Sequence, residues 1–193
     1  TVWEKYDKKY FTSILGEDGY QKIINDLIGS TVDVIFEKAS KIGVQITKRE
    51  FIEQYDNVAI RVYGESRLSK NIDLLIDKLI SNNFKIGLVT AARLPWVEQV
   101  LPRLKNEFVF DYIISLPARK DLRPKPYADG YLEAIKQLGS IPEKTIILED
   151  SNKGIQAGKA SNAFTICLTE NLPKGYEAKG ADLFANNLQE VIK

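Results

Sequence analysis

The spacing of apolar residues divides the chain into two parts with different periodicity. Residues 1–65 show helical spacing and almost no strand pattern, whereas from about residue 66 short apolar runs alternate with helical stripes. Such alternation is typical of a parallel sheet with right-handed crossovers. The pattern therefore predicts an α/β protein, with a small helical domain over residues 1–65 and a parallel sheet flanked by helices over residues 66–193.

The helical part contains apolar stripes at residues 23–28, 32–39 and 51–62. Thr31 and Thr47 precede the second and third stripes as N-cap candidates, and Glu50 follows Thr47 at the spacing of a capping box. Stripes of this kind are more often packing surfaces than ligand sites. We therefore expect a helical bundle in which only the loops face a ligand.

The second part contains apolar runs that predict strands at residues 84–90, 108–114, 146–149 and 164–168, with a short further segment at 181–184. Helices are predicted at 72–80, 95–104 and 131–138. Two more are predicted, one in the segment that follows residue 151 and one at the end of the chain. The carboxyl ends of parallel strands share one edge of a sheet, where open α/β folds bind ligands.

Composition and charge narrow the possible functions. The 193 residues carry 27 Lys and Arg against 26 Asp and Glu, so a net charge of +1 gives no argument for a nucleic-acid or membrane partner. No apolar stretch approaches the roughly 20 residues of a membrane span. The single cysteine, Cys167, excludes an internal disulfide and fits a reducing cytoplasm, where we expect the protein. The absence of histidine excludes histidine catalysis by these residues.

Two adjacent carboxylates, Glu149 and Asp150, follow the apolar run 146–148. A buried strand would deliver both to the carboxyl edge of the sheet, and Mg²⁺ takes one or two protein carboxylates together with water and substrate phosphate. Thr90 ends another predicted strand, and Lys125 lies in a proline-containing loop. Individually, Thr90 suits a helix cap and Lys125 a solvated turn. Together, a hydroxyl, an ammonium and two carboxylates predict a phosphoryl site that lacks only a nucleophile.

In these motifs the sequence resembles the haloacid dehalogenase-like hydrolase superfamily, in its branch of phosphatases and phosphomutases with a helical cap. GLVTA at 87–91 resembles the second motif of that family, KPYADGYL at 125–132 the third, and LEDSNKG at 148–154 the fourth. The resemblance implies a Rossmann-like core with a cap formed by residues 1–65. It also implies that Thr90, Ala91 and Lys125 bind the phosphoryl group, with Thr90 and Lys125 catalytic, and that Glu149 and Asp150 hold Mg²⁺.

The first motif of the family, an Asp-x-Asp-Gly segment that ends a central strand and supplies the nucleophile, has no counterpart in this sequence. In the family that strand lies between the strands that here end at Thr90 and Asp150. We therefore expect these two strands to be left without a shared neighbour, and the natural protein to carry roughly 15 to 20 further upstream residues, enough for a strand and its turn. The chain without them is expected to be inactive.

The resemblance implies a Mg²⁺-dependent phosphohydrolase that acts on a small phosphorylated metabolite through an aspartyl-phosphate intermediate. Two alternatives stay open: a phosphomutase similar to β-phosphoglucomutase, and an inactive domain of the same fold that binds phosphate for regulation. A dehalogenase is disfavoured, because those relatives need no metal and lack the pair formed by Glu149 and Asp150.

Overall fold

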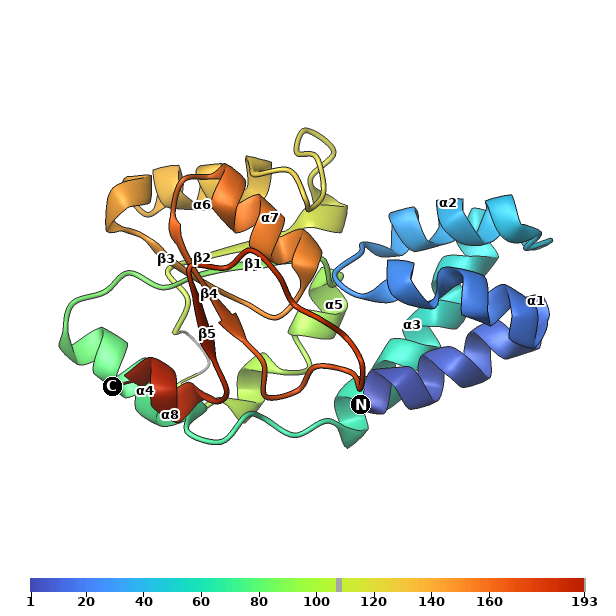
Figure 1. Ribbon diagram of the computed structural model, residues 1–193, viewed down its shortest axis with the longest axis horizontal. Coiled ribbons are helices and arrows are strands. Elements are labelled where there is room, and N and C mark those ends of the chain that lie inside the picture. Colours follow the sequence, from blue (N-terminus) through green and yellow to red (C-terminus); the bar gives the residue numbers. More distant parts are fainter. Residues whose placement is uncertain (107–108, 193) are drawn as a thin grey trace.

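The computed structural model describes residues 1–106 and 109–192, which form a helical part and an α/β part (Figure 1). The helical part consists of α1 (Val2–Leu27), α2 (Val32–Ile42) and α3 (Lys48–Glu65). The predicted caps are present. The Thr47 side chain accepts a hydrogen bond from the Glu50 amide, and the Glu50 carboxylate accepts one from the Thr47 amide at 2.8 Å. Helix α1 is kinked at Gly16, where φ is +71°.

One continuous apolar cluster fills the helical part. Aromatic rings dominate it: Phe51 contacts Tyr10, Phe11, Phe36 and Tyr55 at centroid distances of 5.3 to 6.2 Å. The buried members of the cluster are Phe11, Tyr20, Ile23, Leu27, Val32, Ile35, Ala39, Val44, Phe51, Tyr55, Ala59 and Trp96. The last of these comes from the α/β part and connects the two parts through their packing.

The α/β part alternates strands and helices as the periodicity predicts. Its strands are β1 (Gly87–Thr90), β2 (Tyr112–Ser115), β3 (Ile146–Glu149), β4 (Phe164–Leu168) and β5 (Leu183–Ala185). Its helices are α4 (Ile72–Ser81), α5 (Leu94–Val97), α6 (Asp129–Gln137), α7 (Asn152–Ala160) and α8 (Leu188–Ile192). Helices α6 and α7 lie on one side of the strands, and α4 and α8 lie on the other (Figure 1). The predicted α/β class is confirmed.

All strand pairs are parallel, but they belong to two separate sheets. Within the described residues, β1 pairs with β2 and the order of the other sheet is β3-β4-β5. Strands β1 and β3, which end at Thr90 and Glu149, therefore have no strand between them. This is the arrangement expected from the sequence for a sheet without the central strand.

Some of the predicted elements are shorter than expected. Strand β1 covers only the last four residues of the run predicted at 84–90. The helix predicted over residues 95–104 ends after one turn as α5, and a 3₁₀ turn, Leu101–Arg103, follows. Pro102 lies in that turn and lacks the amide that a continuing helix would need. Strand β2 covers the later part of the run predicted at 108–114, and Phe108, where that prediction begins, lies outside the described residues.

Cys167 is buried in β4, where it packs as a small apolar side chain. None of the helices in the described ranges has the length and apolar character needed to cross a membrane.

Candidate active site

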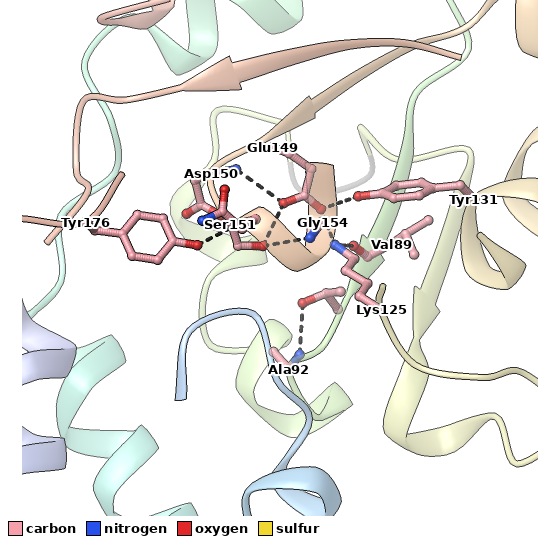
Figure 2. A network of polar contacts seen from close by, with 11 residues as sticks. Val89, Ala92, Lys125, Tyr131, Glu149, Asp150, Ser151, Gly154 and Tyr176 are labelled. Carbon is pink, nitrogen blue, oxygen red and sulfur yellow. Dashed lines mark hydrogen bonds and ion pairs between the residues drawn. The ribbon is translucent and has the colours of Figure 1, made fainter. Parts of the chain in front are cut away.

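The side chain of Lys125 connects the carboxyl ends of the two sheets. Its Nζ donates a hydrogen bond to the carbonyl of Val89 in β1 at 3.2 Å and forms an ion pair with Glu149 at the end of β3 (Figure 2). Both side chains of the ion pair are almost fully buried. The structure thus brings together Lys125, the end of the strand that carries Thr90, and the acid pair.

Both carboxylate oxygens of Glu149 are occupied by protein donors. Oε1 accepts hydrogen bonds from Lys125 and from the Tyr131 hydroxyl, and Oε2 lies 3.2 Å from the Asp150 amide and 3.3 Å from the Ser151 hydroxyl. A buried carboxylate is tolerated when it is paired and hydrogen-bonded in this way. Glu149 therefore fixes the geometry of the strand end in addition to contributing charge.

Gly154 explains the spacing of the Glu-Asp-Ser-x-x-Gly motif. The residue lies in the first turn of α7, and a Cβ atom built on it would come within 2.0 to 2.2 Å of the Glu149 carboxylate atoms. Its amide donates to the Ser151 hydroxyl at 3.0 Å, which makes Ser151 the N-cap of α7. Only glycine leaves room for the carboxylate at this point.

Asp150 differs from Glu149 in its surroundings. Its side chain is accessible and lines the cavity beneath the helical part. Protein atoms crowd the site, and this desolvation, together with the neighbouring negative charge of Glu149, raises the pKa of the Asp150 carboxyl above its usual range. A cation placed beside Asp150 would stabilise the charged carboxylate and so offset this rise in its pKa.

Thr90 and Ala91 face the same cavity. The Thr90 hydroxyl oxygen accepts a hydrogen bond from the Ala92 amide at 3.0 Å, which leaves the hydroxyl proton to be donated to a ligand. Ala91 has no polar side-chain atom, so it can offer a ligand only its backbone amide. This segment supplies neutral donors, whereas Lys125 supplies the positive charge.

Two tyrosines at the site were missed by the sequence analysis. Tyr131 donates to Glu149, and burial together with this carboxylate raises the pKa of its hydroxyl, which therefore stays protonated. The Tyr176 hydroxyl accepts a hydrogen bond from the Asn152 amide at 2.7 Å, on the other side of Asp150 (Figure 2). Tyr131 lies inside the segment 125–132 that carries the third motif, and this position is the sequence signal by which it could have been found. Tyr176 lies in an irregular loop, and no sequence signal pointed to its place at the site.

The cavity that these residues line has a volume of about 2410 Å³ and extends along the gap between β1 and β3. Side chains of the helical part, including Asp7, Tyr20 and Ser30, also line it. In the gap, Ile146 is 57% exposed and Leu148 is 38% exposed. Apolar strand residues normally lie against a neighbour, so the gap has the chemical character of a site for a further strand.

The oxygen donors at this edge fit a hard divalent cation. Among the described residues there is no group of three or more His, Cys, Asp or Glu side chains that could hold a metal, so the acid pair is the available set. Two carboxylates suffice for Mg²⁺, which completes its octahedron with water and substrate oxygens. Because both Glu149 oxygens are engaged, Asp150 is the carboxylate placed to bind an ion directly, with Glu149 beside it.

Comparison with known proteins gives one consistent result. A family model described as haloacid dehalogenase-like hydrolase matches residues 5–168. The chain is 31% identical to a phosphorylated carbohydrates phosphatase from Thermotoga maritima, over 83% of this chain and 70% of the relative. It is 25% identical to a phosphoglycolate phosphatase from Colwellia psychrerythraea, over 77% and 69%. The crystal structure of β-phosphoglucomutase from Clostridium difficile aligns with a TM-score of 0.72 at 25% identity, covering 98% of this chain and 83% of that one.

Proposed function

Since this chain belongs to the haloacid dehalogenase-like hydrolases, we propose that its site binds the phosphoryl group of a small metabolite and hydrolyses the phosphate ester. The observation that carries the proposal is the position of Lys125. Its ammonium joins the carboxyl ends of β1 and β3 and lies beside the acid pair, at the edge where Thr90 and Asp150 face one cavity. Named relatives of the chain are phosphatases.

In this proposal the protein compensates the charge of the phosphoryl oxygens. The Thr90 hydroxyl and the Ala91 amide donate hydrogen bonds to them, and Lys125 supplies positive charge. Tyr131 and Glu149 hold the ammonium of Lys125 in place, because all three meet at one carboxylate oxygen and the Lys125 nitrogen lies 5.0 Å from the Tyr131 ring centre. Preorganised donors of this kind stabilise the transition state without reorganising during the reaction.

Asp150, supported by Glu149, would hold Mg²⁺. A bound ion would neutralise the repulsion between the phosphate and an attacking anion. The raised pKa of the Asp150 carboxyl and its access to the cavity support this assignment.

We propose that the nucleophile is a carboxylate carried on a strand that fills the gap between β1 and β3. The unpaired edges of these strands and the exposed side chains of Ile146 and Leu148 support this position. A carboxylate at the end of such a strand would attack phosphorus and form an aspartyl-phosphate as the bond to the ester oxygen breaks. A second carboxylic acid of the same segment would protonate that oxygen to release the alcohol and would then activate the water that hydrolyses the intermediate to inorganic phosphate. The helical part would act as a cap that excludes bulk water and selects the leaving group.

The test is release of inorganic phosphate from a panel of sugar phosphates and phosphoglycolate, by the protein extended with an upstream strand that ends in Asp-x-Asp-Gly. We expect activity that requires Mg²⁺ and that falls at least about 100-fold in Asp150→Ala and Lys125→Ala. Lys159→Ala, on the far side of α7, is the matched control and keeps full activity. Activity that survives both EDTA and Asp150→Ala would refute the metal assignment.

A phosphomutase is the second candidate, because the structure of a β-phosphoglucomutase aligns over nearly the whole chain. The same assay separates the two functions. A mutase converts a hexose phosphate to its isomer with little net phosphate release, whereas a phosphatase releases phosphate in proportion to substrate consumed.

A further inference from the structure

A lysine of the α/β part contacts the end of the first cap helix. The Nζ of Lys153, in the first turn of α7, donates to the carbonyl of Asp26 at 3.0 Å and to the hydroxyl of Ser30. The Ser30 hydroxyl donates to the same carbonyl. Asp26 lies in the last turn of α1, where carbonyls have no partner within the helix. The three groups therefore form a closed polar contact between the two parts.

The charge of Lys153 complements this helix end. The carboxyl end of a helix carries partial negative charge and favours a cation, yet α1 has no basic residue in its last turn. Lys38 from α2 pairs with the Asp26 side chain at 2.9 Å, whereas Lys153 and Ser30 share the Asp26 carbonyl. Lys153 is half-buried, and this partial desolvation lowers the pKa of its ammonium.

The loop beside this contact lies directly on the acid motif. Gly29, with φ of +69°, follows α1, and a Cβ atom built on it would lie 2.6 Å from the Ser151 hydroxyl. Ser151 is the N-cap of α7 and touches Glu149. One side chain therefore separates the cap loop from the carboxylates proposed to bind the metal, and Lys153 fixes that loop from the same helical turn.

Another connection between the two parts, through Trp96, has a different character. Trp96 of α5 is buried in the cap cluster, and its indole donates to Asp56 at 2.8 Å, where Arg93 also forms an ion pair. Removing this apolar contact would expose a large aromatic surface, whereas the contact of Lys153 consists of hydrogen bonds that water can replace at small net cost. Of these two contacts, that of Lys153 is therefore the easier to break.

We propose that Lys153 is a positioning residue that holds the loop of residues 28–30 closed against α7 and so sets the cap relative to the acid pair. The expected consequence of this role, the placement of the leaving group, rests on the proposed function. Lys153 does not touch the phosphoryl group in this assignment; it acts through Ser30 and the Asp26 carbonyl.

The structural test is amide hydrogen exchange of the protein itself with Lys153→Met, which keeps the length of the side chain and removes its charge. We expect exchange of residues 28–31 to accelerate at least about tenfold, with the cap helices unchanged. Lys153→Arg restores most of the protection. Lys159→Met is the control, because Lys159 lies on the same helix and contacts Asp182 away from the cap. Unchanged exchange in a folded Lys153→Met protein would overturn the proposal.

Binding of inorganic phosphate in the presence of Mg²⁺ provides the second measurement. Inorganic phosphate has no leaving group, so Lys153→Met is expected to bind it within about twofold of the parent, whereas Lys125→Ala loses at least tenfold in affinity. With an ester substrate in the strand-extended protein, Lys153→Met raises KM more than it lowers kcat. If Lys153→Met loses phosphate affinity as Lys125→Ala does, its positioning role is wrong. If no ester is hydrolysed, the proposed function fails while the exchange result still decides the role of Lys153.

Discussion

The helical part and the α/β part bury their apolar residues to different extents. Among the described residues, the helical part forms one continuous cluster, whereas the α/β part holds two small ones, around Tyr131 and around Ile114. Of the thirteen large apolar side chains that are exposed among the described residues, Ile60 alone belongs to the cap. Helices satisfy their backbone hydrogen bonds internally, but each inner strand needs a neighbour on both edges. The cap is thus complete as it stands, and the α/β part is organised around a gap.

The largest expected effect follows from removing the centre of the cap cluster. Phe51→Ala, at a fully buried position surrounded by aromatic rings, is expected to lower the free energy of unfolding by about 3–5 kcal/mol. Both tryptophans, Trp3 and Trp96, pack in this cluster, so tryptophan fluorescence during urea unfolding reports on the cap. Ile60→Ala, at the exposed position, is the control and should change stability by less than about 0.5 kcal/mol. Equal effects of the two changes would refute a continuous cap core.

The buried carboxyl group of Asp7 makes the stability of the helical part depend on pH. Burial raises the pKa of this carboxyl from 3.8 to about 7, although the hydrogen bond from Tyr55 at 2.7 Å opposes the shift. The folded state therefore holds the proton more tightly than the unfolded state. The stability contributed by the protonated group is complete below about pH 4 and is lost as the pH rises through about 7.

Asp7→Asn keeps an acceptor for Tyr55 without the charge, so it should stabilise the protein at pH 8, by roughly 4 kcal/mol at most. The gain should disappear near pH 4. Urea unfolding at pH 4, 6 and 8 measures this slope, and a stability difference that does not depend on pH would contradict the assignment.

Gly154→Ala tests the crowded end of β3. The added methyl group would meet the Glu149 carboxylate, so we expect a loss of about 1–3 kcal/mol in stability and a marked loss of phosphate affinity in the presence of Mg²⁺. Gly64→Ala is the matched control, because nothing lies within 4 Å of a Cβ atom there and α3 should gain slightly from alanine. Phosphate affinity equal to that of the parent in Gly154→Ala would show that Glu149 is not held as described.

The smallest change in the free energy of unfolding is expected for Ile146, which lies at the gap. Ile146 and Ile147 are neighbours on β3, but Ile146 is 57% exposed whereas Ile147 is 5% exposed. Ile147→Ala should cost about 2–4 kcal/mol and Ile146→Ala less than about 0.5 kcal/mol. The same two substitutions are then measured in the strand-extended protein. A strand in the gap would bury Ile146, so the destabilisation by Ile146→Ala should rise to more than about 1 kcal/mol there. An unchanged small cost there would argue that the strand binds elsewhere.

The sequence was sufficient for the fold class, the order of the elements and the capping box at Thr47, because each depends on periodicity or on contacts between near neighbours. The separation of β1 from β3 was also expected, since no sequence run could supply the strand between them. The meeting of Thr90, Lys125 and the acid pair at one edge was predicted, but other side-chain contacts between distant segments were not. The bond from Tyr131 to Glu149, the steric role of Gly154 and the reach of Lys153 to Asp26 all depend on how distant segments pack.

The insertion of Trp96 into the cap has a mechanical consequence. Helix α5 begins at Leu94, only three residues beyond Ala91, so the segment proposed to bind the phosphoryl group runs directly into the helix that carries Trp96. The indole of Trp96 lies 6.0 Å from the ring centres of both Trp3 and Tyr55. We therefore expect a displacement of the helical part to be passed along a few peptide units to the Thr90 hydroxyl. Under the proposed function, admission of a substrate and alignment of its phosphate would then be one coupled motion rather than two independent events.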